Sequence, residues 1–182
     1  MAQATTPKVL DGVRVLELAR WQAAPRGGMV LRDMGAEVIK IEWRKGADLR
    51  NSGPFVDDMS VQFAAYNRGK KSITLNTRHP KGKQMFLDLA KGCDVVLENL
   101  APGSLRRIGL GYEEVAKVNP GIVYCSISGY GQTGPYKDKP AHDPQIQGMS
   151  GLMDINGDAG GPPIKVGFYI GDLVTPMFAC YS

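Results

Sequence analysis

The chain has 182 residues, of which 43% are hydrophobic and 22% charged, the balance of an ordinary soluble globular domain. Its net charge of +4 is uneven, because residues 141–182 carry four aspartates and one lysine, whereas residues 1–140 carry a net +7. The basic residues form no stripe interleaved with aromatic side chains, so no nucleic-acid partner is expected. No apolar run approaches the roughly 20 residues of a membrane span, so no membrane partner is expected either.

The two ends of the chain and its cysteines indicate the cellular location of the protein and its extent. Residues 1–8 are polar and contain no apolar signal core. The three cysteines are an odd count without metal-like spacing, so we expect reduced core thiols, no metal site and a cytoplasmic location. Residues 177–182 stop inside an apolar run without a helix stop signal, which predicts a segment of a larger protein.

The first 42 residues predict a compact βαβ unit. Residues 12–18 alternate and are rich in β-branched side chains, which predicts a strand, and residues 36–42 predict a second one. Between them lie a turn of small residues at 21–25 and a helix over 26–34 that stops at Gly35. This order implies a parallel strand pair with a right-handed crossover.

The rest of the chain continues the alternation of strands and helices. Residues 43–48 read as a loop, residues up to 65 have weak periodicity, and 67–71 form a basic turn. The further expected strands are 72–75, 93–98 and 121–128; the expected helices are 79–91, 104–108, 112–118 and 143–149; the expected loops are 99–103, 129–135 and 156–163. The pattern predicts an α/β fold, a Rossmann-like and mostly parallel sheet with flanking helices. A G-x-G-x-x-G fingerprint is missing, which argues against a dinucleotide site.

Two residues in the acidic C-terminal part are candidates for chemistry. Asp172 follows the strand-like apolar run 168–170 and precedes a helical pattern that begins at Leu173, so we expect it to cap that helix. The helix dipole there would keep its carboxylate ionised. His142 lies 30 residues earlier in the chain. Taken alone, Asp172 is more readily interpreted as a structural helix cap, and His142 as a surface residue, than as catalytic residues.

Several segments at strand ends carry a resemblance when they are taken in chain order. They are Gln22-Ala23-Ala24-Pro25, Ile41-Glu42-Trp43-Arg44, Asn67-Arg68-Gly69-Lys70-Lys71-Ser72-Ile73, Glu98-Asn99-Leu100-Ala101-Pro102-Gly103, Leu110-Gly111-Tyr112 and Ser128-Gly129-Tyr130-Gly131-Gln132-Thr133-Gly134-Pro135. From Leu10 onward the chain resembles the class III coenzyme A transferase family, which includes formyl-CoA and carnitine CoA-transferases and the α-methylacyl-CoA racemases.

The resemblance implies that residues 1–182 form a CoA-binding, Rossmann-like N-terminal domain, truncated before the rest of the family fold. It further implies a homodimer of interlocked subunits, acyl-CoA and carboxylic acids as substrates, and no tightly bound cofactor. Asp172 matches the nucleophile of the transferases, which carries the acyl group as an anhydride and CoA as a thioester. His142 with Asp172 matches the proton-moving pair of the racemases. Transferase, racemase and non-catalytic CoA-binding fragment are therefore the alternatives, and the Asn67–Ile73 and Glu98-Asn99 segments favour the transferase.

The resemblance also assigns expected contacts with CoA. Gln22 and Ala23 match contacts to the CoA backbone or pantetheine arm, and Trp43 with Arg44 stands where the family often has an arginine near the adenine. An indole can stack on a purine, so Trp43 can replace that contact. The remaining matches are Leu75 and Arg78 near adenine and phosphate, Asn99, Leu100 and Ala101 along the CoA tunnel, and Arg107 and Lys139 as cationic contacts.

Overall fold

The structure is a computed structural model that describes residues 7–182; residues 1–6, most of the polar N-terminal segment, lie outside the described residues. The elements are β1 (Arg14–Leu18), α1 (Ala23–Asp33), β2 (Glu37–Glu42), the 3-10 helix η1 (Asp48–Asn51), β3 (Phe55–Val56), β4 (Met59–Ser60), α2 (Val61–Asn67), β5 (Lys71–Thr74), α3 (Pro80–Ala90), β6 (Val95–Glu98), α4 (Ser104–Arg107), α5 (Tyr112–Val118), β7 (Val123–Ser126), α6 (Asp143–Met149) and α7 (Ile170–Tyr181).

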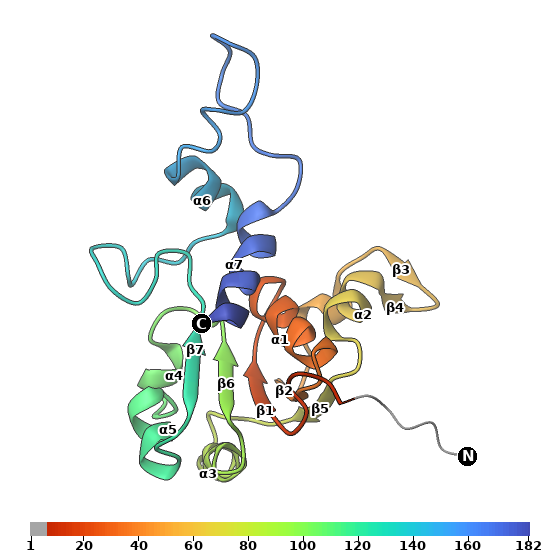
Figure 1. Cartoon of the computed structure of the whole chain (residues 1–182), viewed down its shortest axis with the longest axis vertical. Helices are drawn as coiled ribbons and strands as arrows, with labels where there is room; N and C mark the ends of the chain where they lie inside the picture. Colours follow the sequence, from red (N-terminus) through yellow and green to blue (C-terminus); the bar gives the residue numbers. More distant parts are fainter. Residues whose placement is uncertain (1–6) are drawn as a thin grey trace.

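Five of the strands form one parallel sheet in the order β5-β2-β1-β6-β7, which confirms the predicted α/β class. The chain runs outward from β1 through β2 to β5 and then returns to place β6 on the other side of β1. The strand order therefore reverses between β1 and β6, and ligands of open α/β sheets bind at the carboxyl ends of the strands at such a point. Figure 1 shows α6 and α7 beyond that edge of the sheet.

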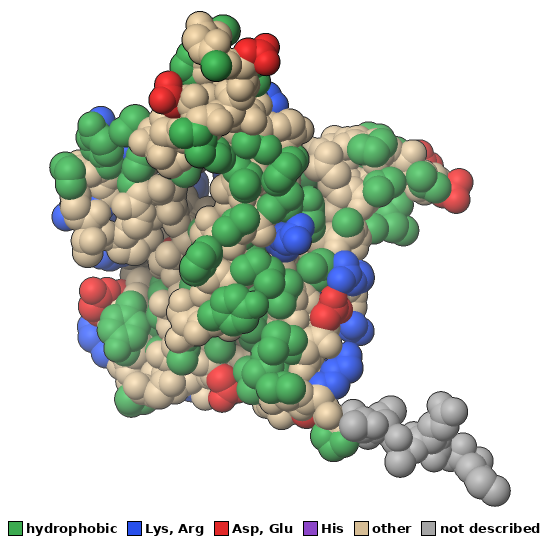
Figure 2. Space-filling model, turned by 45° about the horizontal axis from the view of Figure 1, so that its top comes forward, with side chains coloured by type: hydrophobic (Ala, Val, Ile, Leu, Met, Phe, Trp, Pro, Cys, Tyr) green, Lys and Arg blue, Asp and Glu red, His purple; other side chains and the backbone are tan. Residues whose placement is uncertain are grey.

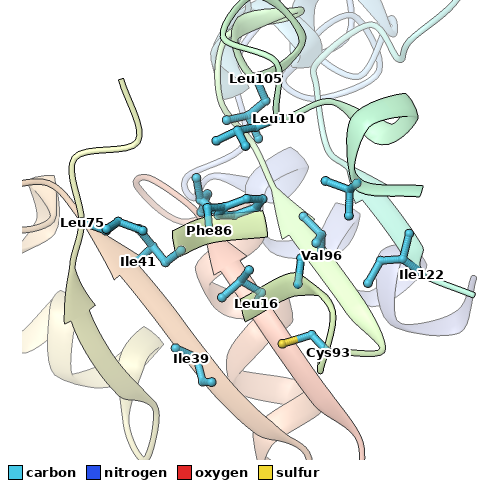
Figure 3. Packing of buried hydrophobic residues seen from close by; sticks show 13 residues of the cluster. Leu16, Ile39, Ile41, Leu75, Phe86, Cys93, Val96, Leu105, Leu110 and Ile122 are labelled. Carbon is cyan, nitrogen blue, oxygen red and sulfur yellow. The ribbon is translucent and has the colours of Figure 1, made fainter. Parts of the chain in front are cut away.

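Apolar side chains cover both faces of the sheet, as a parallel sheet requires. On one face Leu16, Ile39 and Val96 pack with Phe86 of α3, the cluster drawn in Figure 3. On the other face Val15, Val38 and Leu97 pack with the alanines at the start of α1. Neighbouring residues of one strand point to opposite faces, so β1 supplies both clusters.

Three sequence predictions differ from the structure. Helix α1 begins at Ala23 rather than at 26, because Pro25 lies in its first turn, where proline is tolerated. The weakly periodic stretch before residue 65 contains η1, the β3–β4 hairpin and most of α2, elements too short to produce a periodic signal. Residues 168–170 form no strand, and α7 begins at Ile170, so Asp172 lies in the first turn of the helix and is not its cap.

The surface carries several large apolar side chains. Figure 2 shows apolar side chains across the centre of one face, and the exposed residues of α7 include Val174, Phe178 and Tyr181. Among residues 7–182, no helix combines the length and the apolar character needed to cross a membrane.

Candidate active site at the carboxyl edge of the sheet

The carboxyl edge of the sheet opens into a cavity of about 580 Å³. Its walls come from the turn after β1, the loop after β6, the loop after β7, and the starts of α6 and α7. Seven of the residues singled out from the sequence line it: Gln22, Asn99, Leu100, Ala101, Lys139, His142 and Asp172. The structure thus brings together residues that lie up to 150 positions apart in the chain.

Asp172 is half-buried, and within residues 7–182 it forms no ion pair. Burial raises the pKa of its carboxyl above the usual value, the nearby Asp143 carboxylate raises the pKa further, and His142 lowers it. A smaller recess of about 130 Å³ beside it is lined by Ala23, Asn99, His142 and Asp172 among others. The acid therefore faces the cavity instead of being neutralised within the fold.

Asp143, which the sequence did not single out as a site residue, holds the start of α7. Its Oδ1 accepts hydrogen bonds from the backbone N–H groups of Gly171 at 2.6 Å and Asp172 at 3.2 Å. Its Oδ2 accepts one from the side-chain amide of Gln147 at 2.5 Å. Asp143 is thus the cap that was expected of Asp172, supplied from a different helix. The sequence offered one indication of this role, because an aspartate and a glutamine four residues apart on a helix can form a hydrogen bond.

The Gly171-Asp172 pair has a steric reason. A Cβ placed on Gly171 would lie 2.9 Å from Oδ1 of Asp143, closer than ordinary contact permits. A glycine before Asp172 therefore lets the capping carboxylate reach both N–H groups. Gly129, which also lines the cavity, lets the loop after β7 approach Ala141 closely, since a Cβ on Gly129 would lie 2.5 Å from the Ala141 side chain.

The loop after β6 is fixed to the turn after β1 by one side chain. Asn99 Oδ1 accepts the backbone N–H of Arg20 at 2.8 Å, and Asn99 Nδ2 donates to the carbonyl of Arg20, also at 2.8 Å. The next residue, Trp21, has φ of 54° and lines the cavity. A left-handed backbone at a bulky residue is strained and persists where the surroundings over-determine it, which often happens at functional sites.

The expected adenine neighbourhood lies at the far side of Leu100. Trp43, Leu75 and Leu100 line one small hollow at the carboxyl ends of β1, β2 and β6. The guanidinium of Arg78 lies 5.6 Å from the centre of the Trp43 ring. Leu100 lines both the hollow and the large cavity, so the two regions adjoin.

Three of the expected cationic contacts, Arg44, Arg78 and Arg107, line neither the hollow nor the large cavity. Arg44 is exposed in the turn after β2 and lines neither. Arg107 is exposed on α4, where its guanidinium donates to the carbonyl of Pro102 at 3.1 Å and to Ser104 Oγ at 3.1 Å. A further cavity of about 440 Å³ is lined by Glu98, Arg106 and Tyr124 among others, and none of the predicted catalytic or CoA-contacting residues lines it.

Comparison with known proteins agrees with this geometry. The chain is 49% identical over 175 residues to a succinyl-CoA:glutarate CoA-transferase of Mus musculus and 45% identical over 158 residues to an acetyl-CoA:oxalate CoA-transferase of Acetobacter aceti. These alignments cover 94% and 86% of this chain but 40% and 41% of the relatives, so the chain spans less than half of their length.

A solved structure of a CAIB/BAIF family protein from Brucella suis superimposes with a TM-score of 0.91 at 41% identity. The match covers 97% of this chain and 48% of that one. The family model described as CoA-transferase family III matches residues 10–182. With its sheet, its carboxyl-edge cavity and this match along almost its whole length, the chain belongs to CoA-transferase family III.

Proposed function

We propose that this chain is the CoA-binding part of a class III CoA-transferase, which moves coenzyme A from an acyl-CoA to an acceptor carboxylic acid through Asp172. One observation carries the proposal: a half-buried carboxylate without an ion pair within residues 7–182 lines the same cavity as Gln22 and residues 99–101. The names of the relatives, which act on succinyl-CoA with glutarate and on acetyl-CoA with oxalate, support this reaction class.

The proposed chemistry runs in four balanced steps. The Asp172 carboxylate attacks the thioester carbonyl, so a mixed anhydride forms and the CoA thiolate leaves. The thiolate attacks the aspartyl carbonyl of the anhydride, which gives an aspartyl-CoA thioester and releases the first acid. The acceptor carboxylate attacks that thioester, forming a second anhydride and freeing the thiolate again. The thiolate then attacks the acceptor's carbonyl, which yields the new acyl-CoA and the Asp172 carboxylate.

Each tetrahedral intermediate needs hydrogen-bond donors for its oxyanion. The N–H groups of Gly171 and Asp172 already donate to Asp143, so they are committed to capping α7. Gln22 lines the cavity, and its side-chain amide is a donor of the right kind. We assign Gln22 this role in addition to its contact with the pantetheine arm, with Ala23, Asn99, Leu100 and Ala101 along that arm.

The rest of the CoA molecule is assigned by the same argument. The proposal places the adenine near Trp43 and Arg44, and the adenine and phosphates near Leu75 and Arg78. It assigns Arg107 to a phosphate and Lys139 to a further cationic contact. Lys139 lines the large cavity, which supports its assignment, whereas Arg44 and Arg107 would have to reach the ligand from outside it. The proposal includes a homodimer and a cytoplasmic location. Exposed apolar residues on α7 support further contacts there, because such patches mark interaction sites.

The decisive experiment traps the acyl enzyme. The full-length protein is incubated with succinyl-CoA and hydroxylamine, and its peptides are analysed by mass spectrometry. We expect a hydroxamate on Asp172, and we expect Asp172→Asn to lower turnover by about three orders of magnitude or more. Asp154→Asn is the matched control, because Asp154 is an exposed aspartate of the same acidic region. Full turnover with no adduct at Asp172 would refute the proposed intermediate.

The racemase alternative keeps one supporting observation, since His142 lines the cavity with Asp172 and lowers its pKa. In that case deuterium from solvent enters the α-carbon of a 2-methylacyl-CoA, and His142→Gln abolishes the exchange. CoA transfer without deuterium incorporation would dismiss the racemase. Binding of acyl-CoA with neither reaction would identify a non-catalytic CoA-binding module.

A further inference from the structure

Three charged side chains are buried together beneath α1, and none of them lines the cavity of the proposed nucleophile. Glu17 of β1 accepts hydrogen bonds from Lys40 of β2 at 2.8 Å and from Lys70 at 2.7 Å. The exposed side-chain fractions are 0%, 2% and 1% respectively. A buried carboxylate with two ammonium groups is an unusual core, because desolvating each charge is costly. The proposed chemistry uses none of the three.

Both ammonium groups also contact the turn between β1 and α1. Lys40 Nζ donates to the carbonyl of Ala19 at 3.0 Å, just before the turn. Lys70 Nζ donates to the carbonyl of Pro25 at 2.7 Å, in the first turn of α1. Residues 19–25, which include the strained Trp21 and the cavity-lining Gln22, are therefore held at one end by Lys40 and at the other by Lys70.

Lys70 uses all of its donors. An ammonium has three N–H groups, and Lys70 donates to Glu17 Oε2, to the carbonyl of Pro25 and, at 3.1 Å, to Oδ1 of Asn67. A neutral amine has two N–H groups, so loss of one proton leaves one of these acceptors unpaired. The cluster leaves no room for a side chain at position 28 of α1, since a Cβ on Gly28 would lie 1.9 Å from Glu17 Oε2.

We propose that Lys70 is a positioning residue, which together with Glu17 and Lys40 fixes residues 19–25 against the cavity and releases them when one of its N–H donors is lost. The inference rests on the proposed function where acyl-CoA binding is measured, but its structural readout does not.

Lys70 should lose its proton, and so release residues 19–25, in an experimentally accessible pH range. Burial lowers the pKa of Lys70 to about 8, the Glu17 carboxylate raises it, and the Lys40 ammonium lowers it. The other groups facing Lys70 are the amide of Asn67 from α2 and the Pro25 carbonyl from α1. Because the folded pKa lies below the ordinary value of 10.5, Lys70 adds global stability as pH rises from about 8 to 10.5. Over the same pH range the order of residues 19–25 should fall while the global stability rises. A lysine that served only the stability of the fold would not produce this local loss of order.

The test combines hydrogen exchange with acyl-CoA binding in the full-length protein between pH 7 and 9. Exchange at residues 19–26 is read against α5 as an internal reference, and acetyl-CoA is the ligand because its sulfur carries no titrating proton. In the wild type we expect protection of residues 19–26 and affinity for acetyl-CoA to fall across this range. In Lys70→Met we expect both to be low already at pH 7, with affinity reduced roughly tenfold and without a pH step.

Two further variants complete the design. Lys71→Met removes a lysine next in the chain whose side chain is 70% exposed, and it should bind like the wild type. Lys70→Arg retains the charge and should remove the pH step while keeping part of the affinity. If the wild type does not bind acetyl-CoA, the proposed function fails, and the exchange data still decide the inference.

Equal protection of residues 19–26 in Lys70→Met and the wild type at pH 7 would overturn the positioning role. Lys70→Met leaves the Glu17–Lys40 pair charge-balanced, so we expect it to fold. If Lys70→Met does not fold, the hydrogen-exchange measurements on the wild type test the inference by themselves. Protection of residues 19–26 that stays constant from pH 7 to 9 would then overturn it.

Discussion

The sheet region and the segment that follows it bury different kinds of residue. In the sheet and its helices the buried set is mostly apolar, with the Glu17, Lys40 and Lys70 side chains enclosed within it. Over residues 128–169 the buried residues are Asp143 and Gln147, both polar, and nearly every other side chain is at least partly exposed. The candidate active site lies where these two regions meet.

This difference shows two ways of placing a carboxylate. Glu17 is held by ammonium groups inside a packed core, so its position depends on charge balance. Asp143 is held by amide and backbone N–H groups, so its position depends on hydrogen bonds. Asp172, the proposed nucleophile, is half-buried and lacks both kinds of partner for its side chain within residues 7–182. Substituting the three acids in turn separates these cases.

Glu17→Gln should have the largest effect on stability, because it leaves two ammonium groups buried without their counter-ion. We expect a loss of about 3–5 kcal/mol in the free energy of unfolding, measured by chemical denaturation at pH 7. Asp88→Asn is the control, since Asp88 pairs with Lys91 on the surface of α3 and should cost less than about 0.5 kcal/mol. A loss below 1 kcal/mol for Glu17→Gln would contradict the charge-balance account.

Asp143→Ala should have an intermediate effect. It removes the acceptor for two N–H groups at the start of α7, which we expect to cost about 1–2 kcal/mol. Asp143→Asn retains one carbonyl oxygen and should lose less. Both variants remove a charge that raises the pKa of Asp172, so the acid limb of the activity profile should move to lower pH. An acid limb that stays in place in both variants would contradict the assignment of that limb to Asp172.

Asp172→Asn should have the smallest effect on stability and the opposite sign. The folded pKa of Asp172 is raised, so the folded state disfavours the ionised form, and this cost applies at pH 7. The variant should gain up to about 1 kcal/mol, or roughly 2–4 °C in Tm, after allowing for the solvent that reaches this half-buried group. The gain should vanish as pH falls toward the ordinary value of 3.8. A lower Tm at pH 7, compared with Asp154→Asn, would show that the start of α7 stabilises the ionised acid.

The alternating strand and helix patterns determined the fold class, and the helix 143–149 has the bounds predicted from sequence. The parallel pairing of β1 and β2 followed from the strand–helix–strand order, because both strands carry charged residues and neither is a continuous apolar run. The hairpin before α2 and the start of α7 were missed because two-residue strands, and a helix whose cap lies 28 residues away, leave no local pattern.

The sequence alone therefore determined the sheet, its family resemblance and Asp172 as the candidate nucleophile. The tertiary structure alone decided that Asp143 caps α7, that Arg44 and Arg107 lie outside the cavity, and that Lys70 is buried beneath α1 instead of exposed in a basic turn. The physical reason is that side-chain burial and charge pairing depend on residues far apart in the chain. Glu17 and Lys70, for example, lie 53 positions apart, and the sheet order sets which of them meet.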